Sequence, residues 1–438
     1  TDGEFALRLT GLARDSDTQV DFVDDDRRFL APSLTWRPNS DTRITALLRY
    51  KEDETGSTNQ FLPADGTIRD NPNGEIDSDT FTGEPAFDRF DRDSYSLGYR
   101  FEHRFNDTWT VRQNARVDRL EVESEQIFGG GLQGDRRTLD RFAFTADEEV
   151  DGVTVDTQIQ AGLGSGSIRH KLLLGLDYQD YEFDETRGFA FADPIDIFDP
   201  NFGAPIPATA TSMDPQTEQE QFGLYVQDQI TVSEDWVVTL GGRQDEVDTD
   251  TRDRLAGSTT NKSDSEFSGR AGLVYHAGLG LSPYIGYAES FKPTSGTDAQ
   301  GDPFEPTSGE QTEIGLRFTP PGRGLRLTVA LFDLQRENVK TQDPANPNFD
   351  IQRGEVESQG VEIEAQAALD SGVRFIGAYT NQDVEIVESN DGDEGNRPSG
   401  VPGERFSLWA DYRLAGGALE GLRIGAGVRY KGDTFGDS

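Results

Sequence analysis

The sequence predicts an all-β fold: an antiparallel transmembrane β-barrel of which about 17 strands are present. Polar and apolar residues alternate in segment after segment, and short connections alternate with long ones. Composition agrees, because only 34% of the 438 residues are apolar, below the roughly 45–50% of globular chains. So few apolar side chains can cover one thin surface but cannot fill several cores. Aromatic residues make up 10% of the chain, which argues against disorder.

The alternation has a period of two residues, which is typical of a strand. In residues 94–102 apolar side chains occupy every second position, and polar side chains or glycine occupy the others. The pattern recurs in residues 325–331, 405–412 and 422–430. If the apolar side faces lipid, the other side faces a lumen. That side should include Arg326, Arg405, Arg423, Arg429, Glu362 and Glu364.

A large soluble β-sandwich or a β-helix could also alternate, and the connections decide between these folds. Short turns are expected at Pro38–Asp41, Asn106–Asp107, Gly164–Ser167, Ser233–Asp235, Ala277–Gly280, Pro320–Arg323, Leu369–Gly372 and Ala415–Glu420. Long loops are expected at about 17–26, 54–90, 125–136, 188–216, 249–264, 292–309, 339–348 and 389–403. Strict alternation of short and long connections is typical of outer-membrane barrels, with short periplasmic turns and long extracellular loops. A β-helix would show a short fixed repeat, and none is present.

Asp151-Gly152 is a local objection to this topology, because Asp-Gly favours a tight hairpin. A hairpin there would reverse all later strands and move the loop 188–216 to the side of the short turns. We therefore expect residues 137–163 to form one long strand that projects beyond the membrane and is bulged near this glycine. The count is then 17 strands between residues 4 and 432. An odd count, and ends that stop within the pattern, suggest a fragment.

Several segments resemble the TonB-dependent ferric-siderophore receptors, especially the ferrichrome (hydroxamate) type. They are 30–38 (LAPSLTWRP), 105–114 (FNDTWTVRQN), 155–158 (VDTQ), 223–229 (GLYVQDQ), 238–243 (VTLGGR), 287–293 (YAESFKP), 360–365 (GVEIEA) and 407–412 (SLWADY). Each segment is short, but their order and spacing cover nearly the whole chain.

The resemblance implies a 22-stranded barrel in the outer membrane of a Gram-negative cell, plugged by an N-terminal domain. Residues 4–432 would be a partial barrel, with two strands missing before them and three after. The plug, and with it the segment that contacts TonB, would be absent. The implied partners are a ferric siderophore as cargo, the TonB complex, and outer-membrane lipid with lipopolysaccharide. The receptor would be a monomer without a cofactor.

In hydroxamate receptors, aromatic side chains from extracellular loops stack on the iron chelate. By the resemblance, Phe61 stands where the family has a loop Trp, Phe128 replaces a loop Tyr, and Phe189 matches a pocket Phe. Phe191 lies two residues further on, on the same side. Two further pocket tyrosines are replaced, one by Thr58 or Asn59 and one by Gly130. The implied ligand site is therefore Phe61, Phe128, Phe189 and Phe191, with fewer hydroxyls than the family pattern. The alternative is that these rings pack their own loops.

Other chemistry has little support in the sequence. His103, His170 and His276 each adjoin a different short turn, so neither a zinc site nor a Ser-His-Asp triad is expected. The carboxylate runs at 24–26, 147–149 and 391–394 lack the EF-hand spacing, and solvated loop charge is the simpler interpretation. No Cys is present and the net charge is −40, which excludes disulfides and disfavours binding to nucleic acid.

The sequence therefore predicts a transporter rather than an enzyme: a TonB-dependent receptor that binds a ferric hydroxamate siderophore at its extracellular loops and imports it to the periplasm. A receptor for another cargo (a catecholate siderophore, cobalamin or a sugar) and a passive porin remain as alternatives.

Overall fold

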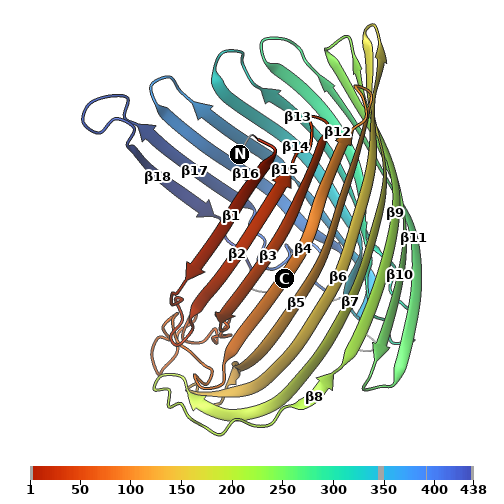
Figure 1. Ribbon diagram of the computed structural model, residues 1–438. Helices are drawn as coiled ribbons and strands as arrows, with labels where there is room; N and C mark the ends of the chain where they lie inside the picture. The colour runs from red at the N-terminus through yellow and green to blue at the C-terminus, as the bar shows by residue number, and fades with distance from the viewer. Residues whose placement is uncertain (1–2, 344–349, 391, 436–438) are drawn as a thin grey trace.

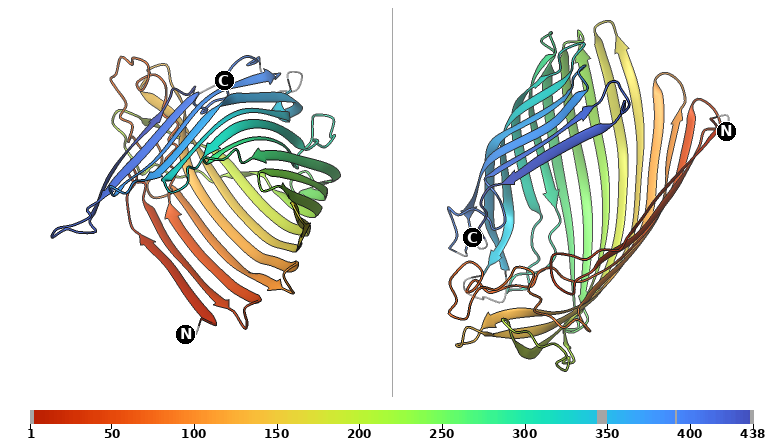
Figure 2. Two further views of the ribbon diagram at one scale, coloured as in Figure 1. Left: turned by 90° about the horizontal axis from the view of Figure 1, so that it is seen from above. Right: turned by 90° about the vertical axis from the view of Figure 1, so that its left-hand side faces the viewer.

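The computed structural model describes residues 3–343, 350–390 and 392–435. Within them, 18 strands form one antiparallel sheet. No helix in the described part of the chain is long and apolar enough to cross a membrane. The sheet curves into a barrel wall that is open between β1 and β18 (Figures 1 and 2). Each long strand pairs with the next long strand along the chain, as an up-and-down barrel requires.

The strands are β1 (Phe5–Arg14), β2 (Asp25–Trp36), β3 (Thr42–Thr55), β4 (Arg89–Arg104), β5 (Trp109–Leu132), β6 (Thr138–Ser165), β7 (Ile168–Asp196), β8 (Ala210–Met213), β9 (Pro215–Val232), β10 (Trp236–Asp253), β11 (Ser258–Tyr275), β12 (Leu281–Lys292), β13 (Thr307–Phe318), β14 (Gly324–Gln342), β15 (Asp350–Ala368), β16 (Val373–Glu388), β17 (Glu404–Arg413) and β18 (Arg423–Lys431). The short β8 lies inside the predicted loop 188–216, and the other 17 correspond to the predicted strands.

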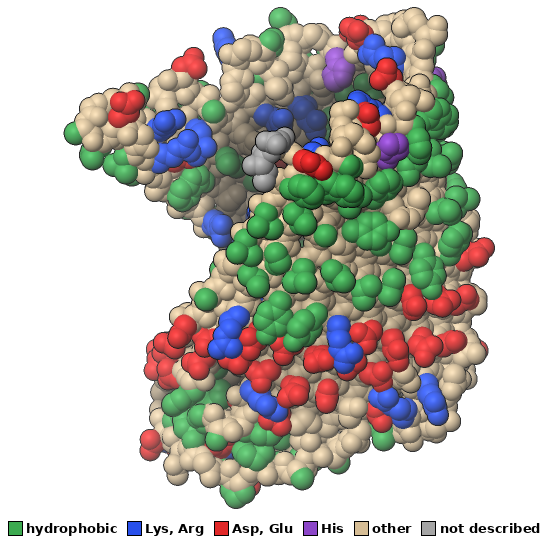
Figure 3. Space-filling model, in the orientation of Figure 1, with side chains coloured by type: hydrophobic (Ala, Val, Ile, Leu, Met, Phe, Trp, Pro, Cys, Tyr) green, Lys and Arg blue, Asp and Glu red, His purple; other side chains and the backbone are tan. Residues whose placement is uncertain are grey.

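The register gives the sheet two chemically different faces. Leu97 pairs with Leu48 and Val117, and Ile314 pairs with Leu331; all five side chains are exposed and lie on one face. Figure 3 shows this face as a band of hydrophobic side chains across the convex outside of the wall. The six side chains predicted to face the lumen lie on the opposite, concave face, so the prediction of the faces is confirmed.

The strands extend further than predicted at three of the long connections. Residues 125–132, 188–196, 249–253 and 258–264 are strand, so only short turns join β5 to β6 and β10 to β11. The predicted loops at 125–136 and 249–264 are therefore corrected. The extensions at 249–253 and 258–264 are polar on both faces, so a hydrophobic period of two is absent there, whereas those at 125–132 and 188–196 also contain apolar residues such as Ile127, Phe189 and Ile195. Of the predicted loop 339–348, residues 344–348 lie outside the described part of the chain.

Residues 138–165 form the single strand β6, as expected, but without a bulge near Gly152. The register shifts lie at 129–132 and 139–141 instead. A Cβ atom on Gly152 would come within 2.7 Å of the Tyr181 ring on the neighbouring strand. The glycine therefore makes room for an aromatic neighbour, which explains its presence without a hairpin or a bulge.

Candidate functional site

β5, β6 and β7 are the longest strands, and the candidate site lies at their ends. β6 has 28 residues, so it is about 90 Å long, whereas crossing a membrane takes only about 9–11 residues. The three strands therefore continue as a ribbon past the hydrophobic band, and Figure 1 shows the ribbon curving under the barrel at the end with the long loops.

Three connections pack on this ribbon and form, with its end, a structure that we call the cap: residues 15–24, 56–88 and 197–209. The cap contains two clusters of buried apolar side chains. Ile76, Leu139, Ile195 and Ile197 form one. Val20, Val23 and Phe81 form the other. Phe202 packs against both, so the two clusters are continuous.

A buried ion pair fastens the cap to the ribbon. Arg141 on β6 and Glu84 are 2.8 Å apart, and each side chain is at most 2% exposed. Arg141 also donates to the carbonyl oxygens of Thr82 (3.1 Å), Gly83 (3.0 Å) and Asp193 (2.8 Å). Glu84 accepts a second hydrogen bond, from the Gly203 amide at 2.7 Å. A buried pair is tolerated when its remaining donors and acceptors are also satisfied, as they are here.

Asp88 lies beside this pair, at the end of the connection 56–88. Its carboxylate accepts hydrogen bonds from the amides of Glu84 (2.8 Å) and Ile127 (3.1 Å). Burial raises the pKa of Asp88 to about 6, although these bonds and the charge of Arg141 oppose the rise. The end of the loop is therefore held by a carboxyl group that titrates near pH 6.

The predicted ligand residues are brought together on the ribbon. Phe61 is 5.5 Å from Phe128, measured between ring centroids, and Phe189 is 5.7 Å from Phe191. Phe142, which the sequence analysis missed, joins the two pairs. It lies 5.9 Å from Phe128 and 5.4 Å from each of Phe189 and Phe191. We call these five residues the phenylalanine row.

Strand pairing builds this row. Phe142-Ala143-Phe144 and Phe189-Ala190-Phe191 are identical triplets that pair in register, with Phe142 opposite Phe191 and Ala143 opposite Ala190. The phenylalanines lie on one face of the ribbon, and the buried Ala143 lies on the other, beneath the cap. The repeated triplet was the signal in the sequence that could have identified Phe142.

Three of the five rings in the row are exposed, and Phe128 and Phe142 are half-buried. Phe191 is 78% exposed, Phe61 is 61% exposed and Phe189 is 37% exposed. Phe61 also has a positive φ of 48°, a strained conformation for a bulky residue. Exposed aromatic surface is suited to binding a ligand with an apolar surface.

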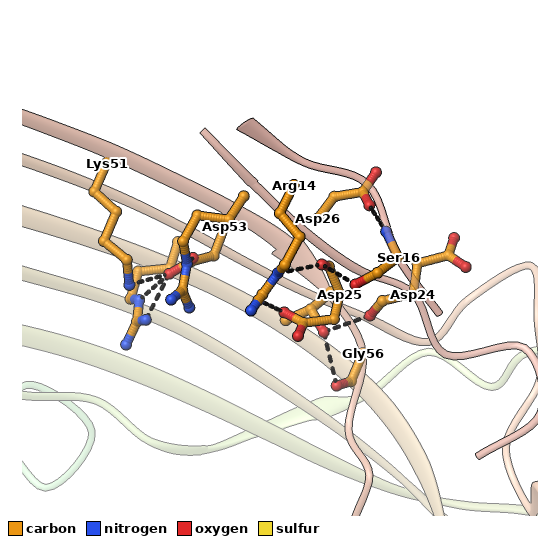
Figure 4. A network of polar contacts seen from close by, with 11 residues as sticks. Arg14, Ser16, Asp24, Asp25, Asp26, Lys51, Asp53 and Gly56 are labelled. Atoms are coloured by element: carbon orange, nitrogen blue, oxygen red, sulfur yellow. Dashed lines mark hydrogen bonds and ion pairs between the residues drawn. The ribbon is translucent and has the colours of Figure 1, made fainter. Parts of the chain in front are cut away.

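A polar network joins the cap to β1–β4 (Figure 4). The Asp53 side chain is only 3% exposed. Its carboxylate forms ion pairs with Lys51 and Arg92, at 2.5 Å each, and a third with Arg27. Within the carboxylate run 24–26, Asp25 pairs with Arg14, and Asp26 accepts a hydrogen bond from the Ser16 amide at 3.1 Å. Two of these carboxylates therefore hold the start of β2, while the Asp25 side chain is still 36% exposed.

The histidines lie apart from the cap and from one another. His103 contacts Thr42 at 2.8 Å, His170 contacts Asp228 at 2.7 Å, and His276 contacts Ser282 at 3.0 Å. In the described part of the chain, no group of three or more His, Asp or Glu side chains is arranged to hold a metal ion.

Comparisons with known proteins agree with this architecture. Residues 34–438 match the family model described as TonB dependent receptor-like, beta-barrel. The chain is 35% identical to the ferrichrome outer membrane transporter/phage receptor of Escherichia coli K12, over all of this chain and 61% of that protein. It is 34% identical to the ferrioxamine B receptor of Salmonella typhimurium, over 97% of this chain and 60% of that protein.

The chain thus spans about three fifths of the length of these relatives. Among solved structures, the closed form of the ferric-catecholate import receptor Fiu of E. coli K12 superposes with a TM-score of 0.85 at 23% identity, covering 98% of this chain and 68% of that one. This similarity concerns the fold. Together with the alternating faces and connections, the family match leads to one conclusion: the chain belongs to the TonB-dependent receptor β-barrel family of the outer membrane.

Proposed function

We propose that this barrel belongs to a receptor that imports ferric siderophores of the hydroxamate class, similar to ferrichrome or ferrioxamine. The relatives named for these two cargoes match nearly the whole chain at 34–35% identity. In this proposal the end with the long loops is extracellular, the short turns are periplasmic, and import is driven by TonB.

The observation that carries the proposal is the phenylalanine row. Five rings in contact offer a broad apolar surface at the cap, and this surface suits the apolar rim of an iron chelate whose polar atoms are turned to the metal. Phe61, Phe128, Phe189 and Phe191 are the proposed contacts, and Phe142 is added to them because its ring touches three of the four.

The test is uptake of radioactive iron by cells in which the full-length protein is the only siderophore receptor. The double variant Phe142→Ala/Phe189→Ala should reduce ferrichrome uptake at least tenfold, because it removes the centre of the row. Phe105→Ala removes an exposed ring at the opposite end of the barrel and should leave uptake unchanged.

Three results would contradict parts of the proposal. Normal ferrichrome uptake by the double variant would exclude the row as the binding surface. Uptake of catecholate but not hydroxamate chelates by the unaltered protein would exclude the cargo class. Uptake that persists in cells lacking TonB would instead favour passive diffusion.

A further inference from the structure

Strand β11 has a long unpaired edge. It pairs along its whole length with β10, but with β12 it pairs only from Arg270 to Val274. Within the described part of the chain, residues 258–269 have no backbone partner on this side. At about 3.3 Å per residue the open edge is about 40 Å long. It belongs to other strands than the phenylalanine row, so the inference below goes beyond the proposed function.

The connection between β12 and β13 is attached elsewhere and leaves this edge free. The Gln352 side chain forms two hydrogen bonds with the backbone of Glu305, at 2.5 and 2.6 Å. The Asn338 side chain donates to the Pro306 carbonyl oxygen at 3.0 Å. These contacts hold the connection on β14 and β15, and a cavity of about 190 Å³ lies between it and the concave face of β10 and β11. Among the described residues, no hydrogen bond joins residues 293–306 to β11.

One contact shows which backbone groups point to the open side. The Gly269 amide donates to the Glu289 carboxylate at 2.7 Å, at the point where β12 stops pairing with β11. The backbone groups of successive residues point to opposite sides of a strand. The same side as the Gly269 amide is therefore faced by the amides and carbonyls of Asn261, Ser263, Ser265 and Phe267. An unpaired edge of this kind is a template for a further strand.

The convex surface beside the edge is acidic. On β10, three carboxylates lie opposite small polar residues of β11: Asp250 opposite Asn261, Asp248 opposite Ser263, and Glu246 opposite Ser265. On β9, Glu218 and Glu220 continue the first two of these rows. Two strand spacings place all five acidic residues within about 10 Å of β11. A long cationic side chain on an added strand can lie across the small residues and reach these carboxylates.

A second copy of this chain does not fit the edge. Two barrels in one membrane have the same orientation, so they are related by a rotation about the membrane normal and their β11 strands cannot run antiparallel. Barrel strands are tilted by about 35–45°, so two such edges that face each other would cross at about 70–90° instead of pairing. The added strand must therefore come from another polypeptide.

We propose that the open edge of β11 is a docking surface for an extended, cationic segment of another protein, which binds by adding a strand to the barrel wall. In this mode of recognition, main-chain hydrogen bonds supply the affinity and alternate side chains supply the specificity. The specificity here is for Lys or Arg side chains on the face that meets the five carboxylates. Residues 258–264 are polar on both faces, so a water-soluble segment can reach them.

The test is a fluorescence anisotropy titration of the full-length protein in detergent, with a labelled peptide of alternating threonine and lysine as the probe. This peptide should bind saturably, one per protein, and residues 258–269 should gain protection from hydrogen exchange. A peptide of alternating proline and lysine has the same charge but cannot pair as a strand, and it should not bind saturably. A peptide of alternating threonine and glutamate should not bind either.

Ser263→Pro/Ser265→Pro should weaken binding of the threonine–lysine peptide at least tenfold. It removes two amide donors that point to the open side, where proline is tolerated, and leaves the pairing with β10 intact. The matched control Ser263→Ala/Ser265→Ala loses the same hydroxyl groups but keeps both amides, so its affinity should be unchanged. Circular dichroism checks that both variants fold, and the comparison of peptides on the unaltered protein does not depend on them.

Absence of saturable binding by the threonine–lysine peptide overturns the proposal. Equal affinity for the proline–lysine peptide, or for the proline variant and the unaltered protein, also overturns it, because either result indicates charge attraction without an added strand. A dimer of the unaltered protein that Ser263→Pro/Ser265→Pro converts to a monomer, measured by light scattering, would overturn it in favour of a second copy at the edge.

Discussion

Single charged residues hold the cap on its ribbon. Arg141, Glu84 and Asp88 are far apart in the sequence or lie in a connection with no periodic pattern, so their pairing was not predictable from residue spacing. Phe61, Phe128, Phe189 and Phe191 were selected by resemblance to a family, and the structure shows that their rings lie close together. Whether they bind a ligand remains a prediction.

Asp88 should make the opening of the connection 56–88 depend on pH. Its pKa is about 6 in the folded protein against an ordinary value of 3.8. A carboxyl with a raised pKa favours the folded state most when it is protonated, so this contribution is complete below about pH 4 and is lost as the pH rises through 6. The opening equilibrium of residues 56–88 should increase by up to about a hundredfold over this range, from a shift of about two units.

Hydrogen exchange of these amides, corrected for the intrinsic effect of pH, measures this equilibrium. Asp88→Asn should abolish its dependence on pH between 4 and 7. Asp135 is the control, because hydrogen bonds from Thr138 lower its pKa to about 2. Its contribution is lost only below about pH 4, so Asp135→Asn should leave the profile between 4 and 7 unchanged. An identical profile for Asp88→Asn and the unaltered protein would show that Asp88 is not the titrating group.

Among the strands, prediction succeeded where lipid imposes a pattern. In β14 and β18, apolar side chains must face outward, so the alternation in the sequence fixes the face of every residue. In the extensions of β10 and β11 both faces are polar, so the alternation of apolar and polar residues disappears. In the extension of β11, Lys262 pairs with Asp264 of the same strand at 2.6 Å, and residue composition alone cannot distinguish such a polar strand from a polar loop.

The two faces of β14 should differ in their tolerance of an arginine side chain. Leu331 lies on the convex face and is 55% exposed, whereas Thr328 lies on the concave face. Arginine on the lipid side costs about 2–4 kcal/mol near the middle of the bilayer, and on the lumen side it meets water and other polar groups. Leu331→Arg should therefore reduce the folded fraction in a refolding titration into lipid vesicles far more than Thr328→Arg. Equal losses would mean that the faces are assigned the wrong way round.

The molecule as a whole consists of a wall and a cap that are stabilised differently. Backbone pairing and lipid contact stabilise the wall, whereas the cap has a continuous buried core, as a small globular domain does. Phe202 links the two parts of this core: its ring is 5.3 Å from Phe22 and 5.8 Å from Phe81. The connections 15–24 and 56–88 should therefore open together rather than as independent loops.

Phe202→Ala tests this cooperativity. Loss of the ring should destabilise the cap by up to about 3 kcal/mol, because the ring is partly buried and its removal leaves a cavity. Hydrogen exchange should then accelerate in both 15–24 and 56–88, while the strands within the hydrophobic band keep their protection. Of the two clusters, Phe198 packs on the one around Ile76, so Phe198→Ala should accelerate exchange in 56–88 and leave 15–24 unchanged. If Phe202→Ala accelerates hydrogen exchange in only one of the two connections, the cap is not a single cooperative unit. If exchange in the strands of the wall accelerates equally, the cap and the wall do not open separately.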